Sequence, residues 1–359
     1  MDSLGLHLGQ SEKKAAMSYQ TPGSRLGPVR EVLAALNGAK RILLSTHINA
    51  DGDGVGSQVA LAAWARAEGK ECWIINPTPF PQSLRFLLPD NGWVVDVGAL
   101  EAGELARGAD LSVVLDTGEV PRVGSVIGLL GDLPKVVIDH HPPGPDPLPG
   151  TSLRVPEACA TGELVFDLML AAGGPWPNAS VQGLYVALLS DTGSFRFSNT
   201  TPATHRIAAF LLDRGADPEE LYRLVYGNVP LRKLRLLQVS LKELEVDPDG
   251  DLAWITVPAE AYESLGATAD DIEGLVDFPR DLKGVEVAML FRETVRGATK
   301  VSFRSNGAAD VNALARRFGG GGHVKASGAL VERPLVEVRE EVLKAAREAV
   351  RGRKQDEGE

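Results

Sequence analysis

The sequence has few cysteines, no excess of positive charge and no long apolar run, and each shortage excludes a class of protein. Two cysteines, Cys72 and Cys159, cannot build a disulfide framework, so we expect buried free thiols in a reducing compartment. The net charge of −11 argues against binding to long duplex DNA, which requires many phosphates to be neutralised. No uncharged run approaches the roughly 18 residues of a membrane span, and the N-terminus lacks a secretory signal pattern. We therefore expect a cytoplasmic protein with no membrane partner.

The length and composition predict two globular domains. The chain has 359 residues, of which 44% are hydrophobic and 24% charged, as in proteins with full-sized cores. We expect a poorly ordered tail over residues 1–25, a first domain over 26–228, a linking helix over 229–248, a second domain over 249–353 and a tail over 354–359.

The first domain shows an alternation of short apolar strands and amphipathic helices. We expect strands at 41–46, 72–76, 111–116 and 135–139, with helices at 58–68 and 163–171 among the connections. The strands are nearly continuous in Ile, Leu and Val, which is typical of parallel strands covered on both faces. This pattern predicts a doubly wound α/β domain with a mostly parallel sheet, whose ligand site lies at the carboxyl ends of the strands.

The second domain reads as a smaller α/β domain. Residues 231–247 predict one amphipathic helix that links the two domains. A β-hairpin is expected from 285–292 and 299–304, turning at Arg296 and Gly297. A charged helix is expected over 336–353.

Four short segments of the first domain place acids or imidazoles beside glycine at strand or helix ends. Taken alone, each is more often a turn or a helix cap. All four within one α/β domain are much harder to explain by chance, and they would bring several carboxylates together. Carboxylates in one cleft repel one another unless cations are present. The segments are HINADGDG (47–54), DTG (116–118), DHH (139–141) and DTG (191–193).

This mixture of carboxylates and imidazoles predicts a metal-dependent hydrolase. Such ligands suit Mn²⁺, Fe²⁺ or Co²⁺, and Mg²⁺ less well. Two ions about 4 Å apart can share a water, lower its pKa and promote in-line attack on phosphorus. We therefore expect two divalent ions, with Mn²⁺ favoured and Mg²⁺ or Co²⁺ left open.

The motifs together resemble those of the DHH-family phosphoesterases, which are named for the run seen here at 139–141. HINADGDGVGS, VVLDTGEVPRVG, VIDHH and LLSDTGSFRF occur in the family's order, and GGGGHVKASG resembles the signature of the DHH-associated domain. The resemblance covers roughly residues 28–345. One departure is Ala50, where the family often has proline before the first aspartate; no ligand is lost by it.

The resemblance implies a role for each polar residue of these motifs. Asp139 would orient a ligand, and His141 would face the substrate phosphate, where it could stabilise the transition state or protonate the leaving group. Asp116, Asp139 and His141 are thus the expected catalytic residues. One metal would be bound by His47, Asp51 and Asp116, and the other by Asp53, Asp116, His140 and Asp191, with Asp116 bridging.

The run Gly319–Gly322 suggests a binding role for the second domain. Residues 310–318 predict a short helix capped by Asp310 and stopped by glycine. The glycines could then expose consecutive N–H groups as an anion-binding nest, especially if a second helix begins near His323. A flexible hinge is the alternative for an isolated glycine run. In similar proteins the arginine and histidine that correspond to Arg304 and His323 contact the terminal phosphate or base of the substrate. With the glycines of the nest and Asn306, the expected substrate-binding set is Arg304, Asn306, Gly320, Gly321, Gly322 and His323.

The choice of phosphoester follows from the compact two-domain length. RecJ-type exonucleases are usually longer, and membrane-bound cyclic dinucleotide phosphodiesterases have spanning helices. The chain resembles the class of bifunctional nano-RNases and pAp phosphatases, which implies short single-stranded RNA and adenosine 3′,5′-bisphosphate (pAp) as substrates. A substrate of about two to five nucleotides needs few phosphate contacts, which fits an acidic protein. A soluble cyclic di-AMP phosphodiesterase, a family II-like pyrophosphatase and a non-catalytic nucleotide sensor are the alternatives. Similar proteins are often homodimers.

Overall fold

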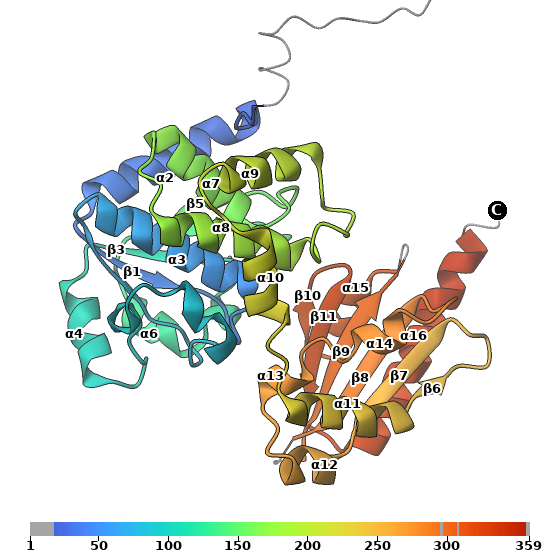
Figure 1. Cartoon of the computed structure of the whole chain (residues 1–359). Helices are drawn as coiled ribbons and strands as arrows, with labels where there is room; N and C mark the ends of the chain where they lie inside the picture. The colour runs from blue at the N-terminus through green and yellow to red at the C-terminus, as the bar shows by residue number, and fades with distance from the viewer. Residues whose placement is uncertain (1–17, 295–296, 307–308, 357–359) are drawn as a thin grey trace, which may run out of the picture. The chain divides into compact units, whose positions relative to one another are not determined.

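The computed structural model describes residues 18–294, 297–306 and 309–356, with side chains as far as Arg351. The chain divides into two compact units, Met1–Asn228 (unit 1) and Val229–Glu359 (unit 2). Each unit contains one sheet with helices on its faces (Figure 1). Among the described helices, none is long and apolar enough to cross a membrane.

Unit 1 is built on a parallel sheet of five strands. The strands are β2 (Glu71–Ile74), β1 (Arg41–Ser45), β3 (Leu111–Leu115), β4 (Lys135–Asp139) and β5 (Thr151–Arg154), in that order. The helices are α2 (Leu26–Gly38), α3 (Gly52–Ala67), α4 (Leu100–Gly108), α5 (Val120–Val123), α6 (Ile127–Leu130), α7 (Thr161–Ala172), α8 (Asn178–Asp191), α9 (Pro202–Leu212) and α10 (Pro218–Tyr226). Short 3₁₀ helices are η1 (Gly23–Arg25), η2 (Gln82–Leu87), η3 (Asn91–Trp93) and η4 (Gly124–Val126).

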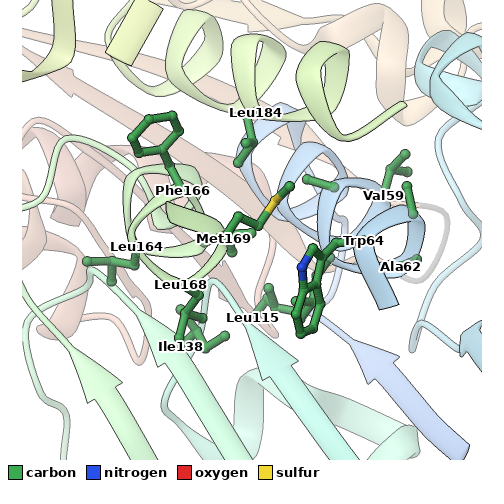
Figure 2. Close-up of a cluster of buried hydrophobic side chains, with 14 of the residues drawn as sticks. Val59, Ala62, Trp64, Leu115, Ile138, Leu164, Phe166, Leu168, Met169 and Leu184 are labelled. Carbon is green, nitrogen blue, oxygen red and sulfur yellow. The ribbon is translucent and has the colours of Figure 1, made fainter. Parts of the chain in front are cut away.

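The strands of unit 1 are buried on both faces because successive side chains point to opposite sides. Val113 and Leu115 of β3 belong to the core beneath α2, α3, α7 and α8, while Val114 belongs to the core beneath α4 and α6. Figure 2 shows the first of these cores, where Leu115 and Ile138 of the sheet lie beneath side chains of α3, α7 and α8. The predicted doubly wound α/β fold is confirmed. The strand β5 was not predicted, since TSLR is short and only partly apolar.

Residues 18–25 differ from our expectation of a loose tail, and residues 1–17 lie outside the described part. Tyr19 and Thr21 donate hydrogen bonds to Asp167 on α7, at 2.8 and 2.7 Å. Arg25 is buried and lies 2.6 Å from Glu163 and 3.1 Å from Asp167. The prediction failed because the partners are two buried acids on α7, which the local sequence of the tail does not reveal.

Unit 2 contains a mixed sheet of six strands, in which β7 and β8 are parallel and the other pairs antiparallel. The strands are β10 (Gly321–Gly322), β11 (Ala326–Val331), β9 (Thr299–Ser305), β8 (Val287–Glu293), β7 (Leu252–Val257) and β6 (Glu245–Val246), in that order. The helices are α11 (Leu231–Lys242), α12 (Ala259–Ser264), α13 (Ala269–Ile272), α14 (Asp277–Arg280), α15 (Val311–Arg316) and α16 (Leu335–Asp356).

The two faces of this sheet also have separate cores. Leu252 and Trp254 pack with residues of α15 and α16, whereas Ala253 and Ile255 pack with Leu236 of α11 and with neighbours of α12 to α14. The predicted hairpin is present as the antiparallel pair β8 and β9. Arg296, the first residue of its predicted turn, lies outside the described residues.

Two boundaries of unit 2 differ from the prediction. The helix expected over 231–247 ends at Lys242, because Glu245 joins the sheet and accepts a hydrogen bond from Trp254 Nε1 at 3.0 Å. The last helix was expected to end at Arg353 but continues to Asp356.

Candidate metal centre

The polar residues predicted in unit 1 gather at the carboxyl edge of the parallel sheet. His47 follows β1, Asp116 follows β3, and Asp139 ends β4, with His140 and His141 directly after it. The carboxyl ends of neighbouring parallel strands meet at the same edge of a sheet, which brings these side chains together.

Two more carboxylates come from the first turn of α3. Asp51 caps this helix and accepts hydrogen bonds from the N–H groups of Asp53 and Gly54, both at 3.1 Å. A Cβ atom at Gly54 would lie 2.7 Å from Thr46 Oγ1 and 3.4 Å from Asp116 Oδ2. Glycine at this position therefore allows α3 to approach the end of the sheet.

Asp116 lies at the centre of the cluster. Its Oδ2 atom is 3.2 Å from His47 Nε2, and its Oδ1 atom is 3.5 Å from His140 Nε2 and 3.6 Å from His141 Nδ1. Its backbone has a φ of 62°, in the left-handed region. This single carboxylate thus faces imidazoles on both sides.

His140 faces the remaining carboxylates. Its Nε2 atom lies 3.1 Å from Asp191 at the end of α8 and 3.5 Å from Asp53. Its Nδ1 atom lies 3.1 Å from the carbonyl oxygen of Ala158. Donation from Nδ1–H to that carbonyl would leave Nε2 as the atom through which the neutral ring binds a metal ion.

Among the groups whose donor atoms lie within 4.8 Å of one another, two consist of expected metal ligands and overlap. Asp116 belongs to both sets. Asp191 lies beside the second set, because its carboxylate contacts Nε2 of His140. The sets are His47, Asp51 and Asp116, and Asp53, Asp116 and His140.

The pKa values of the cluster reflect its closely spaced and largely buried carboxylates. Burial alone would lower the pKa of His47, but hydrogen bonds to Asp116 and Asp51 raise that pKa to about 10. Burial raises the pKa of Asp53 well above its usual value, and the charges of Asp116 and Asp191 raise it further. Within the described residues, these acids form ion pairs with histidines and with no lysine or arginine. A donor set of this chemistry fits divalent cations such as Mn²⁺.

His141 is oriented by Asp139. The Oδ1 atom of Asp139 accepts hydrogen bonds from the backbone N–H of His141 at 3.1 Å and from its Nδ1 atom at 2.8 Å. Both residues are buried. Asp139 therefore holds an imidazole beside the two donor sets.

In unit 2, Arg304 and Asn306 lie at the end of β9. Arg304 Nε is 3.6 Å from Asp277 on α14, and its guanidinium is partly exposed. The side-chain amide of Asn306 donates to the carbonyl oxygens of Arg280 and Val285, at 2.7 and 3.1 Å. Both donors of Asn306 therefore serve the fold of unit 2.

The glycine run forms β-structure, and His323 is followed by the strand β11, so the helix that would have favoured a nest does not begin there. Gly319 ends α15 with a φ of 75°, and Gly320 N–H donates to Ala315 at 3.0 Å. A Cβ atom at Gly320 would lie 2.8 Å from the Cα atom of Ala329. These glycines allow the backbones of β10 and β11 to come close, so the expectation of an open nest at Gly320 is wrong.

The last glycines and His323 form the edge of this sheet. His323 N–H donates to Ala326 O at 2.7 Å, and Ala326 N–H donates back at 3.2 Å. In an antiparallel ladder the next pair, Gly322 and Ser327, does not exchange hydrogen bonds. The N–H of Gly322 therefore points away from β11, whereas Gly321 pairs with Gly328.

Comparison with known proteins identifies the family. Residues 41–188 match the model of the DHH family, N-terminal domain, and residues 256–352 match the DHHA1 domain. The chain is 36% identical over 330 residues to the bifunctional oligoribonuclease and PAP phosphatase NrnA of Thermus thermophilus, covering 88% of this chain and 94% of the relative. The chain belongs to the DHH family. The NrnA protein of Bacillus subtilis is 29% identical over 305 residues, or 84% of this chain and 92% of the relative.

Solved structures of DHH-family proteins share the fold. An exopolyphosphatase-related protein from Bacteroides fragilis matches with a TM-score of 0.82 and 27% identity, covering 93% of this chain and 98% of that one. RecJ from Thermus thermophilus, solved with Mn²⁺, matches with a TM-score of 0.56 and 17% identity, covering 94% of this chain and 57% of that one.

The sequence reasoning missed two residues of this DHH-family site, Thr161 and Gly162 at the start of α7. Their N–H groups donate to the two carboxylate oxygens of Asp53, at 2.6 and 2.9 Å. The Thr161 hydroxyl donates to Asp116 Oδ1 at 3.0 Å. A threonine at a predicted helix start is a weak local signal, and nothing near it in sequence indicates acids so far away.

Proposed function

We propose that this protein is a metal-dependent phosphoesterase that hydrolyses short 5′-phosphorylated oligoribonucleotides to mononucleotides and removes the 3′-phosphate of pAp. The convergence of two carboxylate and histidine sets on Asp116 is the observation that carries the proposal. The similarity to NrnA, a named bifunctional oligoribonuclease and PAP phosphatase, over 94% of that protein supports the choice of substrate.

We propose that two divalent ions, Mn²⁺ in the first instance, bind at these sets. When bound, they would neutralise the charge on the phosphate and activate a water for in-line attack. Each set combines carboxylate and imidazole, which favours Mn²⁺ over Mg²⁺. One ion would be held by His47, Asp51 and Asp116, and the other by Asp53, Asp116, His140 and Asp191.

His141 is the proposed acid of the reaction. The hydrogen bond between Nδ1 and Asp139 fixes the ring and leaves Nε2 as the atom that can donate a proton. That donation would go to the leaving oxygen of the substrate, or it would stabilise the charge that develops on the phosphoryl group. Asp139 would strengthen either role by stabilising the charged imidazole.

Unit 2 is proposed to hold the substrate. The guanidinium of Arg304 is positively charged, and the Gly322 N–H and His323 provide hydrogen-bond donors at the edge of the sheet. These groups suit a terminal phosphate or the edge of a base. The homodimer and the cytoplasmic location also stay predictions.

A substrate panel tests the function. Purified protein with Mn²⁺ is given pApA, pAp, cyclic di-AMP and pyrophosphate at equal concentration, and initial rates are compared. We expect the highest rates for pApA and pAp. Fast hydrolysis of pyrophosphate with no turnover of pApA would overturn the proposal, and a dominant rate on cyclic di-AMP would assign the protein to that alternative.

The alternative of a binding protein without activity has its own test. A His140→Ala variant is compared with the parent on pApA, because the side chain of His140 faces both Asp53 and Asp191. We expect loss of turnover in the variant only. A sensor would show no turnover in either protein.

A further inference from the structure

A single buried turn contacts three of the proposed metal ligands, Asp53, Asp116 and His140, yet belongs to none of the four motifs. It comprises residues 158–162, between β5 and the first turn of α7, and we call it the 158–162 turn. Ala158, Cys159, Ala160 and Thr161 are all buried. The turn therefore forms an inner wall of unit 1 beside the cluster.

Thr161 is the residue of this turn with the most direct contacts. Its N–H lies 2.6 Å from Asp53 Oδ2, and its hydroxyl lies 3.0 Å from Asp116 Oδ1. Asp53 is proposed to bind one ion, and Asp116 both. One residue thus fixes carboxylates from α3 and from the end of β3.

The rest of the turn is held in place by further contacts. Glu163 accepts from the Cys159 N–H at 2.9 Å and pairs with buried Arg25. The side chain of Asn199 donates to the carbonyl oxygens of Cys159 and Asp191, at 3.0 and 3.1 Å. These bonds leave the backbone of the turn little freedom, so its donors have defined positions.

We propose that Thr161 is a positioning residue of the metal centre, which sets the orientation of the Asp116 carboxylate through its hydroxyl. The inference rests on the proposed metal-dependent function. Asp116 Oδ1 faces both His140 and His141 at 3.5 and 3.6 Å, so rotation of this carboxylate would misplace an oxygen that should bind an ion. A buried hydroxyl on the first turn of a helix is a neutral donor that holds one oxygen and adds no charge.

Three variants separate this role from packing. Thr161→Val keeps the shape and removes the hydroxyl, Thr161→Ser keeps the hydroxyl, and Thr256→Val is the matched control in unit 2. The Thr256 hydroxyl is buried and forms no hydrogen bond among the described residues. Calorimetric titration of the metal-free protein with Mn²⁺, the unfolding temperature, and kcat and KM on pApA are measured for each.

We expect Thr161→Val to bind Mn²⁺ about 10- to 100-fold more weakly and to lose kcat more than KM, as for other groups that orient metal ligands. Thr161→Ser should restore most of the affinity, and Thr256→Val should match the parent. Folded Thr161→Val with Mn²⁺ affinity within about twofold of the parent would overturn the inference, since loss of a group that orients a metal ligand costs about tenfold or more.

Two further outcomes are informative. If Thr161→Val does not fold, the pair Thr161→Ala and Thr161→Ser gives the same comparison, and equal affinity in that pair overturns the inference. If the parent binds no Mn²⁺, the proposed function fails together with the inference. A parent that binds Mn²⁺ alongside an unaffected Thr161→Val overturns the inference alone.

Discussion

Unit 1 and unit 2 both have a sheet covered by helices on two faces, but they present their candidate functional residues differently. In unit 1 the residues are buried charges within a few ångströms of one another, around Asp116. In unit 2 Arg304 and His323 are partly exposed, and neighbouring polar groups such as the Asn306 amide serve the fold. The difference fits the roles proposed for the units, with chemistry at the buried charges of unit 1 and substrate binding at the surface of unit 2.

The largest expected effect comes from removing the centre of the unit 1 cluster. Asp116→Ala should lower kcat by more than about 100-fold and weaken the binding of both metal ions. Loss of a residue that only orients a metal ligand already lowers affinity or activity about 10- to 100-fold, so loss of a ligand should cost more. Turnover of pApA and the bound metal content measure the two effects. The control is Asp132→Ala, an exposed acid of the same unit. Unchanged metal content and activity in Asp116→Ala would rule out its bridging role.

The glycine run should be sensitive to substitution because its backbone packs closely on β11. In Gly320→Ala the new methyl group would press on Ala329 and on the carbonyl of Gly328. We expect a loss of about 1–3 kcal/mol in the free energy of unfolding, as for other overpacked sites. Chemical denaturation measures it, with Gly128→Ala as the control because a Cβ there meets nothing within 4 Å. Equal stability of the two variants would contradict the close packing of β10 on β11.

Substitutions in unit 2 should change KM, whereas substitutions in the unit 1 cluster should change kcat. Arg304→Ala and His323→Ala are expected to raise KM about tenfold with little change in kcat, since uniform binding is lost without loss of transition-state stabilisation. Arg317→Ala is the control, as Arg317 is exposed and paired with Glu348. A fall in kcat at constant KM would place these residues in the chemistry and erase the contrast between the units.

The smallest effect concerns an acid of unit 2 that has no part in the site. Burial alone would raise the pKa of Asp271, but the hydrogen bond from Arg232 and those from Thr268 lower it. Its contribution to stability is therefore present above the unfolded pKa of about 3.9 and lost as pH falls through the lower folded value.

Asp271→Asn should accordingly lower the free energy of unfolding by about 1 kcal/mol at pH 7, a small value because Arg232 is half exposed. Below the folded pKa of Asp271 the substitution should change the free energy of unfolding very little. Urea unfolding of parent and variant at pH 7 and near pH 2 checks the sign. A difference that grows on acidification would show that the assigned direction is wrong.

Much of unit 1 could be predicted because its signals are local. An apolar run followed by Asp116, or by Asp139 and two histidines, indicates both a strand and its carboxyl end. Parallel pairing of the strands then brings these polar residues to the same edge of the sheet. Thr161 could not be predicted, because it contacts Asp53 across 108 positions through a backbone N–H, which any residue except proline carries. The N-terminal side chains that pair with Asp167 could not be predicted either, because their partner lies more than 140 positions away in the sequence.

Unit 2 was harder to predict for a physical reason. A glycine run is compatible with a nest, a hinge or a close approach of two strands. Which of these forms depends on neighbours such as Gly328 and Ala329, which the local sequence around the run does not identify. The helix expected over 231–247 was too long because Glu245 pairs with Trp254, a contact between separate elements.

The backbone of Asp116 lies in the left-handed region, and this conformation has an energetic cost. A side chain in that region costs on the order of 1 kcal/mol compared with glycine, although aspartate tolerates it better than most. Glycine at position 116 would relieve this backbone cost, but it would leave buried polar groups of His47 and Thr161 without the carboxylate that they contact, at about 1–3 kcal/mol each. The contacts of the carboxylate therefore outweigh the backbone preference, and aspartate is stable at this strained position.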